Sequence, residues 1–220
     1  MIRRIERYLR QEENFSLLNV NQATRILKSF SYAAHSNLMR IPLLEMLVRK
    51  IHQNIDTLRE NDVIAILKAY QYLSTDVKFS SKLIQDLNAT VVSTALENKN
   101  EVSVGFLVNY LHNFFLINQR NQVASRDLSK EQRESLVGLL EEKLKTSDQH
   151  TKGVSSVMTL GLSRILIRNP KQEVIRETLA SSLRTQARKL NFEELHSALY
   201  ALRSAYNSDK TVKDAGLQAK

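Results

Sequence analysis

The sequence predicts an all-α protein, specifically a right-handed α-solenoid of about four to five helix-hairpin repeats of roughly 40 residues. Three observations lead to this fold class. The 220 residues include only 5 Gly and 2 Pro, where average usage would give about 15 and about 11. Sheets need many turns built from these residues, so sandwiches, barrels and Gly-rich phosphate loops are disfavoured. Apolar residues make up 42% of the chain, enough for a folded core.

The third observation is an internal repeat. The segment Ile26–Tyr32 recurs 40 residues later as Ile66–Tyr72, and Phe106–His112 occupies the same frame after another 40. We expect each copy to lie in the first helix of a hairpin. A polar residue stands about five positions before each copy, and Asn in particular is a favoured helix cap. The predicted caps are Asn21, Asn61 and Glu101.

The segment after each copy repeats as well. Apolar residues spaced by four lie on one face of a helix, so each segment predicts the second helix of a hairpin. The sets are Leu43, Leu47 and Ile51; Leu83, Leu87 and Val91; Leu136, Leu140 and Leu144; and Ile175, Leu179 and Leu183. Two further first helices are predicted at Val154–Leu166 and Leu195–Tyr206.

In chain order, the predicted elements form a single helical-repeat domain over residues 1–207, followed by a flexible tail over 208–220. A lone first helix covers about residues 2–13. Hairpins follow at about 20–57, 60–98, 101–146 and 151–190, and a final helix covers 191–207. A polar insertion at about 118–130 separates the two helices of the third hairpin. The alternative fold is a compact helical bundle in which the 40-residue period is accidental.

The sequence offers little that could carry catalysis. Cysteine is absent, which excludes disulfides and thiolate sites. The five histidines have no metal-ligand spacing, and no phosphate-loop or nucleophile-elbow motif occurs. His112 stands in the frame position of Tyr32 and Tyr72, which favours a structural role. We therefore predict a protein that is not an enzyme and has no cofactor. No apolar run is long enough to span a membrane.

Positive charge is concentrated toward the two ends of the sequence. The formal net charge is +9, divided as +4 over residues 1–60, −1 over 61–150 and +6 over 151–220. Arg side chains bind phosphate through two hydrogen bonds, and a polyanion gains affinity as counterions are released. The alternative is that these residues only solvate outer helix faces. The C-terminal candidates for RNA binding are Arg164, Arg168, Arg176, Arg184, Arg188, Lys189 and Arg203.

A second candidate surface lies on the repeated first helices. Arg25 and Lys28 in one copy and Lys68 in the next could face a single RNA strand. The Lys28 and Lys68 position becomes Val108, Thr159 and Tyr200 in later copies. The chain is therefore not expected to read a base sequence by itself. Tyr32 and Tyr72 could stack on bases or pack between helices.

The pattern Asn-x-x-x-x-Ile-Leu-Lys-x-Phe/Tyr-x-Tyr, followed by a Leu-rich second helix, resembles the helical-hairpin repeats of organellar proteins. These are the heptatricopeptide and octotricopeptide repeats found in FAST-kinase-like and RAP-domain proteins. The resemblance implies RNA binding or RNA processing in mitochondria or plastids, or residence in a mitochondrial ribosome. The sequence lacks the RAP domain of some members, which favours binding or scaffolding over processing.

The repeats, the charge and the resemblance together predict a non-enzymatic RNA-binding protein of the mitochondrial matrix. We expect it to contact ribosomal or other organellar RNA through phosphates and to contact neighbouring proteins in a complex such as the mitochondrial ribosome. The rival hypothesis is a protein scaffold, such as an accessory subunit of a respiratory or ATP-synthase complex. It rests on the apolar cluster Phe114–Ile117, and burial of that cluster inside the fold would remove its main support. The first helix, residues 2–13, is Arg-rich and amphipathic like a transit peptide, but its acidic residues favour a retained helix.

Overall fold

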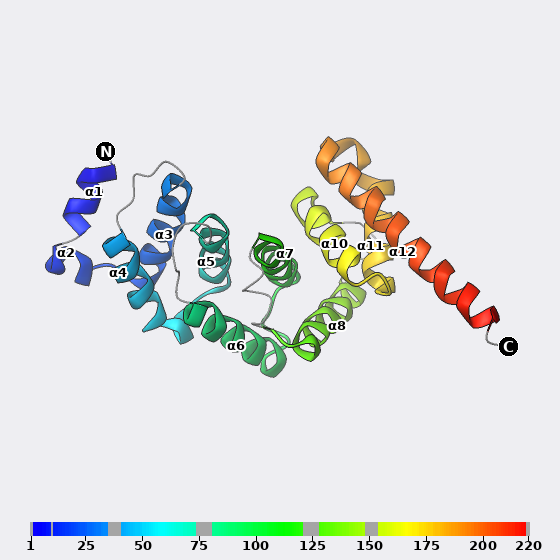
Figure 1. The fold of residues 1–220 in the computed structure, drawn as a ribbon, viewed down its shortest axis with the longest axis horizontal. Helices are drawn as coiled ribbons and strands as arrows, with labels where there is room; N and C mark the ends of the chain where they lie inside the picture. The colour runs from blue at the N-terminus through cyan, green and yellow to red at the C-terminus, as the bar shows by residue number, and fades with distance from the viewer. Residues whose placement is uncertain are drawn as a thin grey trace. The chain divides into compact units, whose positions relative to one another are not determined.

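The computed structural model describes residues 2–9, 11–34, 41–73, 81–120, 128–147 and 154–218. In these residues all regular structure is helical, and they contain no strand (Figure 1). The all-α prediction is therefore confirmed. The helices are α1 (Ile2–Leu9), α2 (Glu12–Ser16), α3 (Val20–Ala34), α4 (Ile41–His52), η1 (Ile55–Thr57), α5 (Glu60–Leu73), α6 (Ser81–Glu97), α7 (Val104–Arg120), α8 (Lys130–Thr146), α10 (Ser156–Arg168), α11 (Glu173–Gln186), η3 (Ala187–Lys189) and α12 (Phe192–Gln218).

The chain divides into two compact units. Unit 1 comprises residues 1–97 and 116–132, and unit 2 comprises residues 98–115 and 133–220. The predicted hairpins correspond to successive helix pairs in chain order, namely α3 with α4, α5 with α6, α7 with α8, and α10 with α11. The final predicted helix corresponds to α12.

In unit 1 the first helices of the first two hairpins pack against each other. α3 lies along α5 and also contacts α4, while η1 contacts α6. The repeated frame contains two aromatic positions with different surroundings. The first position, Phe30 and Tyr70, is buried, whereas Tyr32 at the second position is exposed. The repeat therefore encodes a core aromatic and, two residues later, an aromatic at the edge of the helix pair.

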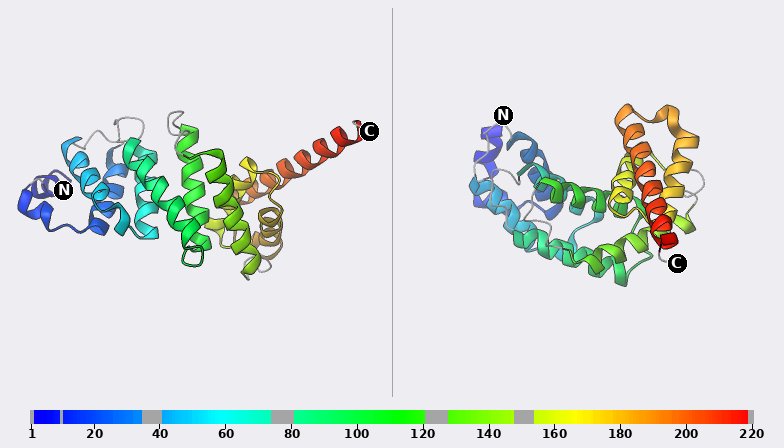
Figure 2. Two further views of the ribbon diagram at one scale, coloured as in Figure 1. Left: turned by 90° about the horizontal axis from the view of Figure 1, so that it is seen from below. Right: turned by 45° about the vertical axis from the view of Figure 1, so that its right-hand side comes forward.

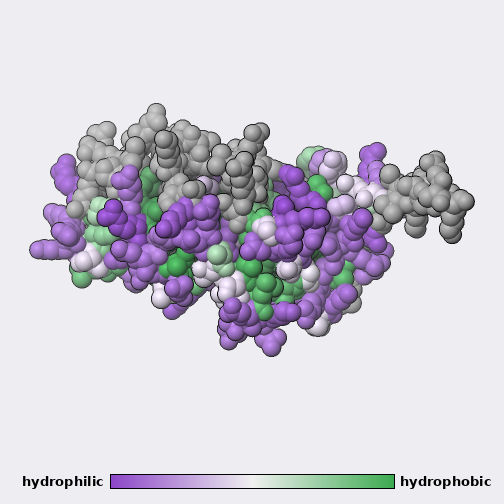
Figure 3. Space-filling view, turned by 60° about the horizontal axis from the view of Figure 1, so that its bottom comes forward, coloured by the Kyte–Doolittle hydropathy of each residue, from purple (hydrophilic) through white to green (hydrophobic). Residues whose placement is uncertain are grey.

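The second helices also bury the residues that their spacing predicts. All nine leucine, isoleucine and valine residues of the first three sets are buried, as are Ile175 and Leu179, whereas Leu183 is only half-buried. Among the residues coloured by hydropathy in Figure 3, hydrophilic side chains predominate, with hydrophobic surface between them. The residues spaced by four are buried together because the 3.6-residue period of a helix directs every fourth residue to the same side.

The predicted helix caps are wrong. α3, α5 and α7 begin at Val20, Glu60 and Val104, so Asn21 and Asn61 lie inside their helices and Glu101 lies before its helix. α3 is instead capped by Asn19, whose Oδ1 accepts a hydrogen bond from the Gln22 N–H at 2.8 Å. The Asn19 N–H donates in return to Gln22 Oε1 at 3.0 Å. This reciprocal pair is a capping box, which satisfies two backbone donors at once.

In unit 2, α10 is packed between two other first helices. One side of α10 lies along α12, and both helices contact α11. The other side approaches α7 at Gly161, where a Cβ atom would lie 2.5 Å from Cγ1 of Val108. Glycine at this position permits the close approach of the two helix backbones. α8 joins α11 through Glu141, whose Oε1 accepts a hydrogen bond from the Val174 N–H at 3.0 Å.

The two ends of the chain differ from the prediction. The lone helix predicted over 2–13 is two short helices, because the chain is extended at Gln11. The Asn14 side chain stabilises this break by donating to the Tyr8 carbonyl at 3.0 Å and to Gln11 Oε1 at 2.6 Å. At the other end, α12 continues to Gln218 through the predicted tail and extends past α10 (Figure 2).

The predicted polar insertion over 118–130 is shorter in the structure. α7 continues to Arg120 and α8 begins at Lys130, while residues 121–127 lie outside the described residues. Pro42 is the second residue of α4, where its missing N–H is harmless. No helix among the described residues has both the length and the apolar character required to cross a membrane.

Candidate nucleic-acid interface

The α3–α5 pair is fixed at its N-terminal end by a buried carboxylate. Asp62 is 3% exposed. Its Oδ1 accepts a hydrogen bond from Asn21 Nδ2 at 2.8 Å and lies 2.9 Å from the Thr24 hydroxyl, both on α3. Its Oδ2 accepts a bond from the Arg59 N–H at 3.2 Å, at the start of α5. One side chain therefore caps α5 and fixes the register of α3 along it.

Apolar packing holds the rest of the pair together. Leu27 and Phe30 on α3 are buried, as are Ile66 and Leu67 on α5. Since Asp62 and these residues set the register, the residues that repeat at an interval of 40 come to lie at matching heights on the two helices. Lys28 and Lys68 form one such pair.

The two lysines influence each other electrostatically. Burial, and secondarily the positive charge of Lys28, lower the pKa of the Lys68 ammonium below its ordinary value of 10.5. Both side chains are half-buried, and among the described residues no carboxylate forms an ion pair with either of them. The pair is therefore a cationic site that an anion would stabilise.

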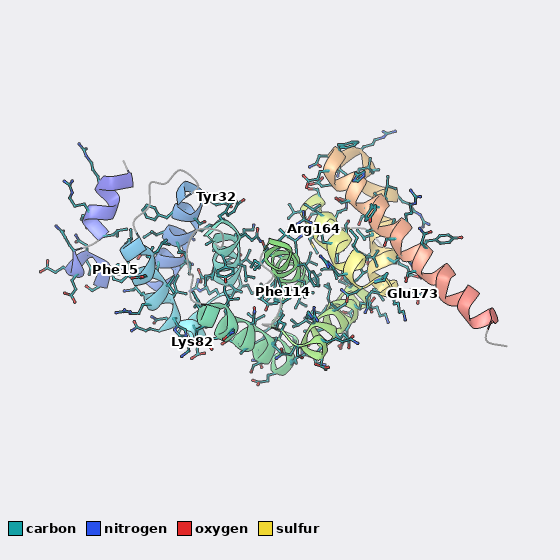
Figure 4. All side chains as sticks on the ribbon, in the orientation of Figure 1. Phe15, Tyr32, Lys82, Phe114, Arg164 and Glu173 are labelled. Carbon is teal, nitrogen blue, oxygen red and sulfur yellow. The ribbon has the colours of Figure 1, made fainter. Side chains whose placement is uncertain are left out.

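An aromatic pair lies one helical turn beyond the lysines. The rings of Tyr32 and Tyr72 are 4.5 Å apart between centroids and inclined by 48°. Tyr32 stands at the C-terminal end of α3 (Figure 4) and is 49% exposed. The Tyr32 ring therefore packs between helices, as one of the two alternatives predicted, and its exposed surface is compatible with the other, stacking on a base.

Arg25 completes this surface. It is exposed and lies three residues before Lys28, on the same side of α3. We call the surface the Lys–Tyr face and define it as Arg25, Lys28, Tyr32, Lys68 and Tyr72. The structure thus brings together the three basic residues predicted in unit 1 and adds two tyrosines to them.

The seven basic residues predicted in unit 2 have several different environments. Arg164 on α10 is half-buried (Figure 4), and Arg176 forms an ion pair with Glu173, with 3.6 Å between Nη2 and Oε1. These two residues are therefore not freely exposed cations. Five exposed residues remain: Arg168 at the end of α10, Arg184, Arg188 and Lys189 close together in sequence on α11 and η3, and Arg203 on α12.

The Lys–Tyr face is not repeated in unit 2. Val108 and Thr159, which stand in the frame position of Lys28 and Lys68, are buried in α7 and α10. His112, in the frame of the exposed tyrosine, is half-buried, and its Cβ lies near Gly161. Two of the three residues of unit 2 that correspond to the lysines therefore belong to helix packing, whereas the third, Tyr200 on α12, is 56% exposed and carries no charge.

The described residues contain no cluster of three or more His, Cys, Asp or Glu side chains that could hold a metal ion. His52 and Asp86 form a close pair between α4 and α6, with 2.6 Å between Nε2 and Oδ2. Two side chains alone do not form a metal site, and this pair instead links the second helices of consecutive hairpins.

Comparisons with family models, with curated proteins and with solved structures found no match for this chain. The residues of this chain are therefore the basis for assigning its function. Sequence reasoning missed the role of Asp62, although it stands 40 residues after Gln22 and, like Gln22, accepts a hydrogen bond from the backbone N–H three residues before it. It also missed the exposed large hydrophobic residues on α12. Besides Tyr200 there are three whose regular spacing of seven was a usable signal: Phe192, Leu199 and Tyr206.

Proposed function

We propose that this protein is a non-enzymatic RNA-binding protein whose Lys–Tyr face holds a single RNA strand. The observation that supports this proposal most directly is the juxtaposition of Lys28 and Lys68 with the half-exposed Tyr32. Ammonium groups attract phosphates, and an aromatic ring stacks on any base. The combination suits RNA without strong base preference, as expected for a structural component.

The wider setting is part of the same proposal. The repeat, its resemblance to organellar helical-hairpin repeats and the net charge of +9 favour a right-handed α-solenoid within a mitochondrial ribonucleoprotein, such as the mitochondrial ribosome. The exposed residues Arg184, Arg188 and Lys189 would provide further phosphate contacts from unit 2.

The scaffold hypothesis has lost its main support. Phe114 (Figure 4), Phe115 and Ile117 are all buried, and Leu116 is half-buried. A buried cluster stabilises the fold and offers no surface to a partner. An accessory subunit of a respiratory or ATP-synthase complex is therefore no longer favoured by that cluster.

The proposal is tested by the affinity of the full chain for a fluorescently labelled 20-nucleotide oligouridine, measured by anisotropy at several salt concentrations. In the double variant Lys28→Gln/Lys68→Gln, we expect affinity near 0.1 M salt to fall by roughly 10- to 25-fold. The slope of log affinity against log salt should fall in magnitude by about 1.4, because each phosphate contact with a single strand contributes about 0.7.

The matched control is Lys82→Gln/Lys171→Gln, which removes the same charge from exposed positions on α6 and before α11. This control should reduce affinity by less than about threefold, since it changes only the general field. Equal losses in the two double variants would show that the Lys–Tyr face is not the site. Affinity that does not depend on salt would contradict phosphate binding altogether.

A further inference from the structure

α12 presents an unusual stripe of exposed side chains. Phe192 is 84% exposed, Leu199 53% and Tyr206 68%. His196 and Arg203 are also exposed and lie between them in sequence. The five residues are separated by alternating intervals of four and three, which places all of them on one side of a helix. We call these five residues the α12 stripe.

The opposite side of α12 is already occupied. Ala198, Ala201 and Ala205 are fully buried, and Glu194 is buried near the start of the helix. α12 packs along α10 and also contacts α11 (Figure 1). In unit 2, α7, α10 and α12 form a row with α10 in the middle. The α12 stripe occupies the position where the next helix of this row would pack.

The start of α12 is firmly fixed, which gives the stripe a defined geometry. Asn191 and Glu194 form a capping box, in which the Asn191 N–H donates to Glu194 Oε2 at 2.9 Å and the Glu194 N–H donates to Asn191 Oδ1 at 3.0 Å. The Phe192 ring stacks on His196, with centroids 6.1 Å apart and planes inclined by 24°. The exposed Phe192 ring therefore packs on a neighbour within its own helix.

The spacing of the stripe fits a helical partner. Phe192, Leu199 and Tyr206 repeat every seven residues, as the residues of one coiled-coil seam do. Their separation of 14 residues corresponds to about 21 Å of helix, or about four turns. A nucleic-acid strand has no apolar side chains to pack around Leu199, whereas an amphipathic helix supplies them at matching intervals.

The charge of the stripe indicates which helix would bind. Of its two polar members, Arg203 carries a positive charge and His196 offers a ring N–H donor, and residues 151–220 carry a net charge of +6. Two copies packed in parallel would place Arg203 against Arg203, and an antiparallel pair centred on Leu199 would place Arg203 opposite Leu195, beside His196. Neither arrangement supplies a carboxylate. Glu193 is exposed but lies about 100° around the helix from Phe192.

We propose that the α12 stripe docks an acidic amphipathic helix of another protein. Apolar side chains of that helix pack on Phe192, Leu199 and Tyr206, and its carboxylates pair with Arg203 and His196. Burial of the exposed rings and of Leu199 supplies most of the affinity, and the charge pairs select the partner. This interface is separate from the Lys–Tyr face, which lies in unit 1.

The test uses the full chain and a display library of 21-residue helices with apolar residues in a heptad pattern and flanking positions randomised between Glu and Lys. We expect selection to enrich peptides with Glu at the flanking positions. A Trp placed in the selected peptide reports its affinity directly, because the chain itself has no Trp. Leu199→Ser should weaken that peptide by roughly 10- to 30-fold, and Arg203→Glu should reverse the preference toward Lys-flanked peptides.

Val157→Ser is the matched control, since Val157 on α10 is 64% exposed and lies outside the stripe. It should leave peptide affinity unchanged. The proposal is wrong if no peptide is enriched, if enriched peptides bind Leu199→Ser as well as the unaltered chain, or if their flanking charges are random. Two other outcomes would also overturn the proposal. Dimerisation of the chain that Leu199→Ser abolishes would assign the α12 stripe to a second copy. Loss of oligouridine affinity in the Leu199→Ser variant would assign the stripe to RNA. Lys28→Gln/Lys68→Gln should not affect peptide binding, so this test and the RNA test fail independently.

Discussion

At the scale of single residues, Asp62 connects two helices of unit 1. Its side chain caps α5 and also bonds to side chains of α3. A buried carboxylate is tolerated only when its oxygens are satisfied, and here three donors surround it. The same bonds determine whether Lys28 lies opposite Lys68. Asp62 is therefore a positioning residue for the proposed RNA site.

Asp62→Ala should lower the free energy of unfolding by about 2–3 kcal/mol, because it removes hydrogen bonds to a charged acceptor and leaves buried donors unsatisfied. Denaturant unfolding measures the change. Asp56→Ala, which removes an exposed carboxylate from η1, should change stability by less than about 0.5 kcal/mol. Equal effects of the two substitutions would mean that the network around Asp62 contributes nothing particular to stability.

The environment of individual residues was the least predictable part of the molecule. The sequence identified Lys28 and Lys68 as equivalent, but their mutual effect on pKa depends on the register that Asp62 sets. In the same way, the Arg residues of the fourth hairpin looked alike in sequence. The structure distinguishes them, because Arg164 is half-buried and Arg176 is paired with Glu173. Burial depends on the tertiary neighbours of each turn, and local spacing does not contain that information.

At the scale of helices, the contact between α7 and α10 shows how closely two first helices approach. The Cβ of any residue replacing Gly161 would lie 2.5 Å from Cγ1 of Val108. Valine is branched at Cβ and has little rotamer freedom in a helix, so Val108 cannot swing away. Gly161 therefore sets the distance between the two helices.

Gly161→Ala should destabilise unit 2 by about 1–2 kcal/mol, since the overpacking cost exceeds the gain in helix propensity. Gly138→Ala is the matched control, because a Cβ at that exposed position of α8 meets no atom within 4 Å. It should stabilise the protein by up to about 1 kcal/mol. Thermal unfolding gives both values. Adding Val108→Ala should relieve part of the Gly161→Ala penalty, and strict additivity of the two changes would contradict the proposed clash.

Helix periodicity predicted the elements and their buried faces well. The repeat interval located four pairs of helices, and the apolar sets of the second helices are buried nearly as predicted. It failed where local side-chain bonds decide the backbone. Asn14 stabilises the break between α1 and α2, and Asn19 with Gln22 caps α3 two residues before the expected position. The helical extent of α12 beyond residue 207 was also missed, because its polar composition resembles that of a loop.

At the scale of the whole molecule, the two proposed surfaces differ in chemistry. The Lys–Tyr face in unit 1 combines ammonium groups with a tyrosine pair, whereas the α12 stripe in unit 2 is mainly apolar with two basic side chains. A polyanion suits the first surface and an acidic helix suits the second. A protein with one surface of each kind could connect RNA to a neighbouring protein, as the proposed residence in a ribonucleoprotein requires.

Gel filtration of the native protein, purified from its source without ribonuclease, tests that residence directly. We expect the chain to elute in a large particle and to move to a much smaller size after ribonuclease treatment, because phosphate contacts would hold it in the particle. A heat-inactivated enzyme serves as the control. A large particle that is unchanged by active ribonuclease would contradict the ribonucleoprotein proposal and favour assembly through protein contacts.

The lowered pKa of Lys68 links folding to charge neutralisation. The folded chain holds this proton less tightly than the unfolded chain does, so the charged ammonium costs the fold free energy at pH values below its folded pKa. That cost disappears as the pH rises from the folded pKa toward 10.5. At neutral pH, where Lys68 stays protonated, a bound anion would remove the same free-energy cost. In the proposed role, unit 1 would reach its full stability only with RNA in place, and unassembled chains would be the more easily unfolded ones.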